Sequence, residues 1–211
     1  MILPHLFYDV EVDDSSSVFD GMDTWVLKTV EFFRENQNLR LLIKPHPAEF
    51  LYYGEESKRP NETIFSLLKE ITLTENIEIL DNNLSIADYS DKIDCGLVWR
   101  STAGLELTLN DVPIIISGMP YYKIILSEEQ ANSPEDYFSR IKQFEEKTVD
   151  RDNKIDAALY LHYLRNYKHY DLNIADYNIK TNSMVWHKEG IYKCIEGVNP
   201  HFNIMIDKLI E

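Results

Sequence analysis

Runs of apolar residues alternate along most of the chain with segments whose apolar residues recur every three or four positions. Short continuous apolar runs predict buried strands, and the wider spacing predicts amphipathic helices. The predicted strands are 1–8, 39–44, 77–80, 96–99 and 112–117, and the helices between them are 22–35, 62–73, 85–91 and 102–109. Strands separated by helices predict an α/β fold with a doubly wound parallel sheet and right-handed crossovers.

Polar residues mark several of the expected helix starts. Asp20 or Asp23 is available as the N-cap of the first helix, and Ser85 as the N-cap of the short third one. Ser133 followed by Pro134 predicts a further helix, because serine favours the N-cap and proline favours the first helical position.

The pattern changes after residue 130. Another helix is predicted over 154–167, residues 169–197 show no clean periodicity, and 202–209 form a last amphipathic piece. Because the tyrosines and Trp186 would be costly to leave exposed, we expect the tail to pack back on the sheet. The predicted organisation is a sheet domain over 1–130 and a helical, irregular C-terminal extension over 131–211.

The overall charge restricts the partners of the chain. With 36 acidic against 21 basic side chains, the formal net charge of −15 disfavours nonspecific attraction to nucleic acid. No segment reaches the roughly 20 apolar residues of a membrane-spanning helix, and the N-terminus lacks a signal-peptide pattern. We expect a cytoplasmic protein that meets a membrane, if at all, as a peripheral protein at its inner face.

The spacing of the cysteines and histidines predicts no metal site. Cys95 and Cys194 lie far apart with no CxxC pattern, so reduced buried thiols are expected. The six histidines form no HxH or HxxxH pair on a predicted element. Neither a metal ion nor another cofactor is therefore expected.

The first candidate site follows the strand at 39–44. Pro45 and Pro47 fix the backbone on both sides of His46 and hold its ring in one direction just past the end of the strand. Lys44 adds a cation that could bind a phosphate or carboxylate in the same crevice. The alternatives are that His46 is a structural polar group and that Lys44 extends to solvent.

The second candidate site lies between the strand at 96–99 and the next helix. Ser101 and Thr102 offer hydroxyls at the helix start, Gly104 permits close approach, and free amides there would suit a phosphate. Glu106 is either a dipole-favoured acid of the first turn or an acceptor for sugar hydroxyls. Arg100 could neutralise a diphosphate or pair with Glu106, and the residues alone do not choose between these roles.

A third polar segment follows the strand at 112–117. Gly118 and Pro120 predict a turn, after which Tyr121 or Tyr122 could stack on a base or sugar. The alternative is that these rings simply pack, because aromatic side chains bury a large area.

Together these segments resemble a known family. Lys44-Pro45-His46-Pro47, the run 101–106, Val112-Pro113-Ile114-Ile115 and the run 118–122 are similar to the C-terminal half of the capsule polysaccharide biosynthesis family. That family includes Kdo transferases and looks related to bacterial polysialyltransferases and teichoic-acid glycerophosphotransferases. The likeness covers roughly residues 1 to 140.

The resemblance implies a GT-B glycosyltransferase, in which two Rossmann-like halves face a cleft and the C-terminal half holds the nucleotide-activated sugar. His46 and Pro47 would then correspond to a His-Pro motif that contacts the nucleotide phosphate, with His46 as the catalytic candidate. Ser101 and Thr102 would be the paired hydroxyls for phosphate, although the family has serine where Thr102 stands. Glu106 would bind the ribose or nucleotide, and Asp9 would lie near the cleft.

The function that this resemblance implies is donor binding in an inverting glycosyltransferase of bacterial capsule or surface polysaccharide synthesis. The substrates would be a nucleotide sugar, with CMP-linked donors as candidates, and a polysaccharide or glycolipid acceptor. The chain begins at the expected donor half, so an acceptor-binding domain or partner chain is also expected. The alternatives are a glycerophosphotransferase or epimerase of the same architecture, and a non-catalytic sugar-nucleotide-binding or interaction module.

Overall fold

The structure is a computed structural model that describes most of the chain. The described residues are 1–7, 17–49, 63–81, 84–87, 89–144, 147–166, 175–178, 183–198 and 203. They form two compact units, Met1–Tyr160 and Leu161–Glu211. The first unit contains the sheet and all of the segments that we expected to form a site.

The first unit is built on a five-stranded parallel sheet. Its strands are β1 (Ile2–Leu3), β2 (Leu41–Ile43), β3 (Ile77–Ile79), β4 (Gly96–Val98) and β5 (Ile114–Ile116). They lie in the order β3-β2-β1-β4-β5, and each neighbouring pair is parallel. The predicted α/β fold with a Rossmann-like parallel sheet is therefore confirmed.

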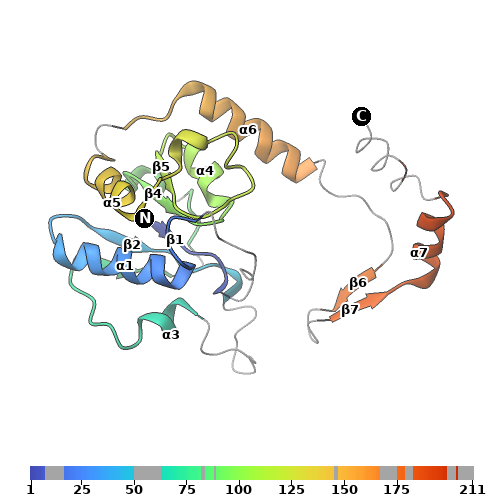
Figure 1. Cartoon of the computed structure of the whole chain (residues 1–211), viewed down its shortest axis with the longest axis horizontal. Helices are drawn as coiled ribbons and strands as arrows, with labels where there is room; N and C mark the ends of the chain where they lie inside the picture. The colour runs from blue at the N-terminus through green and yellow to red at the C-terminus, as the bar shows by residue number, and fades with distance from the viewer. Residues whose placement is uncertain are drawn as a thin grey trace. The chain divides into compact units, whose positions relative to one another are not determined.

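Helices α1 (Met22–Glu35), α3 (Ile64–Leu68) and α4 (Ala103–Leu109) and the 3-10 turn η2 (Ser90–Lys92) connect successive strands of the sheet. The 3-10 turn η3 (Ser127–Glu129) and helix α5 (Pro134–Lys142) follow the last strand, β5. Figure 1 shows α1 and α3 on one side of the strands and α4 on the other. The winding direction thus reverses between β1 and β4, which is where doubly wound sheets open a crevice at the carboxyl ends of their strands.

Helix α1 has the bounds that the periodicity predicts, and its apolar face is buried. Trp25 and Val26 are completely inaccessible to solvent. The ring centroid of Trp25 lies 5.4 Å from that of Trp99, the residue that follows β4. The predicted acidic cap is wrong, because Gly21 is the N-cap and no side chain caps the helix. Asp23 instead lies in the first turn and accepts a hydrogen bond from the Thr24 amide.

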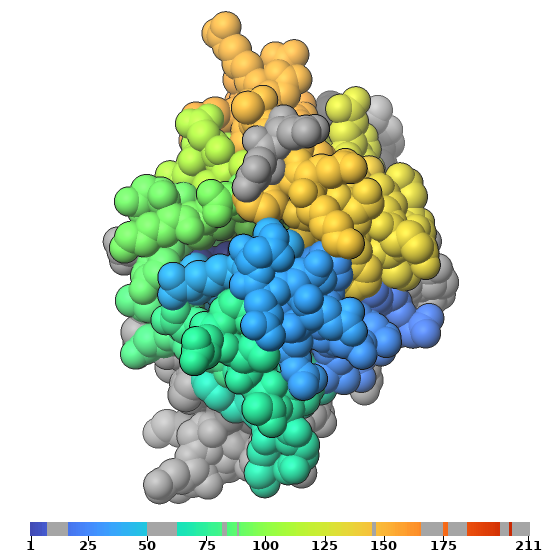
Figure 2. Space-filling view, turned by 90° about the vertical axis from the view of Figure 1, so that its left-hand side faces the viewer, coloured from blue at the N-terminus to red at the C-terminus, as the bar shows by residue number. Residues whose placement is uncertain are grey.

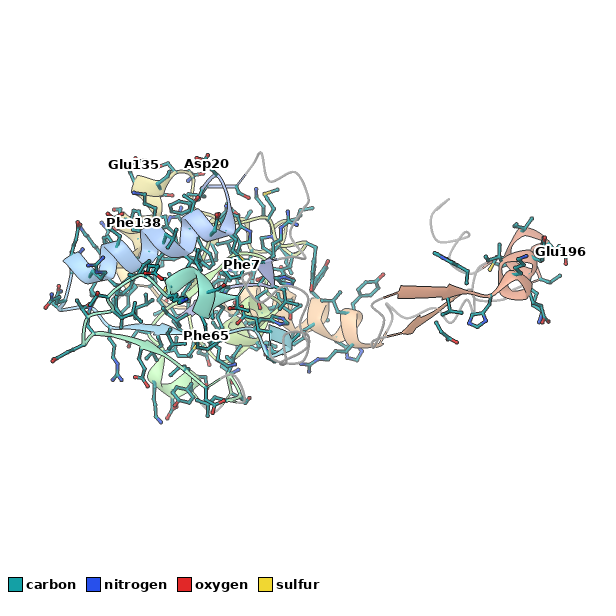
Figure 3. The ribbon with its side chains drawn as sticks, turned by 90° about the horizontal axis from the view of Figure 1, so that it is seen from below. Phe7, Asp20, Phe65, Glu135, Phe138 and Glu196 are labelled. Carbon is teal, nitrogen blue, oxygen red and sulfur yellow. The ribbon has the colours of Figure 1, made fainter. Side chains whose placement is uncertain are left out.

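Helix α5 begins as predicted and packs beside α1. Ser133 caps it by accepting from the Asp136 amide at 3.2 Å, and Pro134 occupies its first turn. The Phe138 ring stacks on that of Phe32 at 4.7 Å, and Figure 3 shows Phe138 next to α1. In Figure 2 the blue surface of α1 lies between the teal α3 segment and the gold α5 segment.

Two of the predicted helices differ from the structure. The helix at 62–73 is confined to α3, where Thr63 and Ser66 form a reciprocal capping box. The prediction of a helix over 85–91 is wrong, since the described residues there contain only the 3-10 turn η2. Ser85 accepts from the Ala87 amide in a local turn, and so short a segment cannot offset the cost of helix nucleation.

The second compact unit contains elements that the sequence did not predict. Strands β6 (Ala175–Asn178) and β7 (Ser183–Trp186) form an antiparallel pair, and helix α7 spans Lys188–Ile195. Helix α6 (Arg151–Asn166), close to the predicted 154–167, crosses the boundary between the units. The predicted piece at 202–209 falls outside the described residues except for Asn203. Packing of this tail on the sheet stays a prediction.

Candidate functional site at the carboxyl edge of the sheet

All five strands run in the same direction, so the segments that follow them meet at a single edge of the sheet. His46 follows β2, Ser101 and Thr102 follow β4, and Tyr121 lies beyond β5. The two candidate phosphate-binding segments thus stand on either side of β1, at the reversal of the winding. The structure brings to one edge the residues that the sequence placed in separate loops.

A tight turn holds His46 in place after β2. The Glu49 amide donates to the His46 carbonyl at 3.0 Å, and the Ala48 amide donates to the His46 Nδ1 at 3.1 Å. Because Nδ1 accepts a hydrogen bond, the neutral ring carries its proton on Nε2. The half-buried ring therefore presents an N–H donor through Nε2, which suits a phosphate oxygen.

Lys44 and Glu49 are buried beneath this turn. Lys44 is 5% exposed and its Nζ donates to the Pro45 carbonyl at 3.1 Å, so the alternative that Lys44 extends to solvent is wrong. Burial lowers the pKa of the Lys44 ammonium, while the charges of Asp81 and Glu49 oppose that shift. Lys44 is thus a buried charge below the turn.

Glu49 is a residue that the sequence analysis missed. Its carboxylate is 2% exposed, and its Oε1 accepts from the Ile64 amide at the start of α3 at 2.9 Å. The other oxygen, Oε2, is buried with no hydrogen-bond partner. Burial raises the pKa of the carboxyl to about 7, against the opposing effects of the Ile64 amide and Lys44. An acid two residues after Pro47 was the available signal, but its burial depends on a distant helix.

The start of α4 differs from the expected cradle of free amides. The Ala103 amide donates to the Ser101 Oγ at 3.2 Å, and the Gly104 amide donates to the Ser101 carbonyl at 3.2 Å. The Leu105 and Glu106 amides both donate to the Thr102 carbonyl. These four amides are therefore engaged within the turn, and the Ser101 and Thr102 hydroxyls are the side-chain donors that this segment offers to an anion.

Tyr122 explains the need for glycine at position 104. A Cβ at this position would collide with the Tyr122 hydroxyl, which donates to the Ser101 carbonyl at 2.7 Å. Tyr122 is completely buried, so its ring supports the loop that carries Ser101. The space at Gly104 is filled by this tyrosine, and the packing alternative holds for Tyr122.

The other predicted site residues are distributed around the same edge. The Tyr121 ring stacks on that of Tyr160 with a centroid distance of 6.1 Å. Because Tyr121 is still 50% exposed, it is accessible to a ligand. Arg100 and Glu106 are half-buried, and Pro47 is exposed on the turn of His46. The remaining predicted residue, Asp9, lies outside the described residues.

A pocket of about 310 Å³ opens at the opposite, amino edge of the sheet. Its lining includes Met1, Arg40, Lys92 and Cys95, which precede their strands or lie near the strand starts. Asn38, Arg40, Lys92 and Asp94 also line this pocket, so it is polar as well as apolar. Burial raises the pKa of the Cys95 thiol to about 11, which disfavours a reactive thiolate there. We place the candidate site at the carboxyl edge, because open parallel sheets bind their ligands at the carboxyl ends of the strands.

Neither a metal cluster nor a membrane-spanning helix occurs in the described part of the chain. No group of three or more histidine, cysteine or acidic side chains there is arranged to hold a metal ion. No helix there has the length and apolar character that crossing a membrane requires. Cys95 and Cys194 are both free thiols; Cys194 is buried as predicted, whereas Cys95 is only half-buried.

The fold and its polar carboxyl edge define a Rossmann-like α/β protein. The model of the capsule polysaccharide biosynthesis protein family matches residues 2–134, which include all five strands, His46 and Ser101. The chain therefore belongs to the capsule polysaccharide biosynthesis family, and this membership assigns it to capsule synthesis. No curated protein and no solved structure matches the chain.

Proposed function

We propose that the carboxyl edge of this sheet binds the nucleotide-sugar donor of an inverting glycosyltransferase in capsule polysaccharide synthesis, in the manner of the C-terminal half of a GT-B enzyme. The observation that carries the proposal is the convergence of His46 and Ser101 at the reversal of winding, within the region that matches the family. Doubly wound sheets bind nucleotides at this position.

The donor phosphate is the group that His46 and the two hydroxyls would bind. The Nε2–H of His46 donates from one side, and the hydroxyls of Ser101 and Thr102 donate from the other. In sugar transfer the nucleotide leaves with its phosphate, so negative charge grows there as the glycosidic bond breaks. Donors already held in position by surrounding hydrogen bonds stabilise that charge without further reorganisation.

Nearby residues would bind the rest of the donor. The accessible ring of Tyr121 offers a stacking surface for a base or sugar. Glu106, in the first turn of α4, could accept from ribose hydroxyls, and Arg100 would add positive charge for a diphosphate. CMP-linked sugars are the first donors to test.

His46→Ala and Ser101→Ala should each weaken nucleotide binding by about tenfold, the scale of one charge-assisted hydrogen bond. The measurement is isothermal titration calorimetry with CMP, CDP and UDP on the wild type and both variants. His46→Gln keeps an N–H donor near the position of Nε2 and should recover part of the lost affinity.

Ser139→Ala provides a matched control, because Ser139 is exposed on α5, away from the carboxyl edge. It should leave affinity unchanged. Equal affinities for the wild type, His46→Ala and Ser101→Ala would overturn the proposed site. Failure of all three nucleotides to bind the wild type would overturn the proposed function.

A further inference from the structure

A second Pro-His dipeptide ends the strand next to β2. The chain reads Pro4-His5 after β1 and Pro45-His46 after β2. In the parallel sheet Ile2 of β1 pairs with Ile43 of β2, and each histidine lies three residues beyond its member of that pair. The pairing continues past the ends of the strands, because the Lys44 amide donates to the Ile2 carbonyl at 3.1 Å. His5 and His46 are thus in register.

The side chains keep this register. The two imidazole centroids lie 5.3 Å apart with the rings tilted by 43°, close to the spacing of about 4.8 Å between neighbouring strands. The His5 amide donates to the Met22 Sδ at 3.2 Å, which fixes the His5 backbone to the first residue of α1. Both histidines are half-buried. The Nδ1 of His5 is buried, so Nε2 is the nitrogen through which His5 would meet a ligand.

We propose that His5 is a second imidazole of the phosphate site and that it binds the nucleotide phosphate together with His46. The inference rests on the proposed function and adds a residue to it. His46 offers its Nε2–H, and His5 contributes a second ring nitrogen at the switch point itself, between β2 and β4. In a chain with a net charge of −15, an anion needs several donors concentrated in one place.

The tilted pair could instead serve only to pack the ends of β1 and β2. Packing and phosphate binding differ in what they predict for a nucleoside without a phosphate. If His5 only packs, its replacement changes the stability of the protein and affects the affinities for cytidine and CMP equally. A phosphate-binding role lowers the affinity for CMP and leaves the affinity for cytidine unchanged.

The experiment compares CMP and cytidine by calorimetry on the wild type, His5→Ala, His5→Gln and His46→Ala, with UDP and uridine as the second pair of probes. His5→Ala should reduce the preference for the nucleotide over the nucleoside about tenfold, as expected for one charge-assisted hydrogen bond. His5→Gln keeps an N–H donor and should restore part of that preference. Urea unfolding of each variant establishes that the protein remains folded.

The outcomes separate this inference from the proposed function. If the preference for CMP over cytidine is unchanged in His5→Ala but reduced in His46→Ala, the role of His5 is overturned and the proposed function stands. Equal loss of CMP and cytidine affinity in His5→Ala would show a packing role and also overturn the inference. If the wild type binds neither nucleotide, both proposals are wrong.

Discussion

Replacing Gly118 with alanine should lower the free energy of unfolding by about 3 kcal/mol, the upper part of the range for overpacking a rigid core. A Cβ at this position would lie 2.6 Å from the Trp99 carbonyl oxygen and 2.7 Å from the Trp99 ring. Neither can move cheaply, because Trp99 is completely buried and Ser117 donates from its amide to the Val98 carbonyl at 3.0 Å. Urea unfolding of the two proteins measures the difference.

The same substitution should also weaken nucleotide binding. Trp99 directly precedes the segment of Ser101, so relief of the collision displaces that segment from the carboxyl edge. Gly21→Ala is the matched control, because its Cβ would meet only the exposed Asp23 side chain, which can rotate away. That variant should change stability by less than about 1 kcal/mol, the usual scale of an N-cap change. Equal stability of the two variants would contradict this account of Gly118.

The second large effect concerns the buried Glu49 carboxyl. Its pKa rises from an ordinary 4.5 to about 7 in the folded chain, so the folded state binds more protons than the unfolded state between these values. The stability of the wild type should therefore fall as the pH rises through this window, by about 3 kcal/mol in total. Below pH 4.5 the carboxyl is protonated in both states and the penalty disappears.

Glu49→Gln should remove this dependence. Glutamine is neutral and keeps an oxygen that can accept from the Ile64 amide, so the variant should gain stability relative to the wild type by about 3 kcal/mol between pH 4 and pH 8. The measurement is urea unfolding of both proteins across that range. The lowered pKa of Lys44 acts in the opposite direction, but Lys44 is present in both proteins, so the difference between their stabilities isolates the effect of Glu49.

Glu78→Gln is the control for the pH series. Glu78 is exposed on β3, where it pairs with Arg40 at 2.5 Å. The free energy of unfolding of this variant should vary with pH nearly as that of the wild type does, since exposed ion pairs contribute little to stability. A Glu49→Gln profile that also runs parallel to the wild type would show that the Glu49 carboxyl is not held protonated near neutral pH.

Strands β1, β4 and β5 could be predicted because they are buried on both faces. The residues of β4 and β5 are all buried, so their segments appear in the sequence as continuous apolar runs. Helix α1 has a single buried face and therefore a clear helical period. The pair of β6 and β7 escaped prediction because strands of four residues are too short to establish an alternation.

The candidate site was predictable only in part. The strand ends identified His46 and Ser101, since parallel strands direct their carboxyl ends to one edge. Other features depend on contacts between distant residues, such as the Tyr122 hydroxyl against Gly104 or the Glu49 carboxylate at Ile64. The pairing of His5 with His46 required the register between β1 and β2, which a single sequence does not contain.

The location of a bound nucleotide tests the central claim most directly. A crystal structure of the chain with CMP should show the phosphate within hydrogen-bond distance of the His46 Nε2, at the carboxyl ends of β2, β1 and β4. The Ser101 or Thr102 hydroxyl should contact the same phosphate from the other side. A nucleotide bound instead in the pocket at the amino edge, beside Met1 and Arg40, would contradict the account.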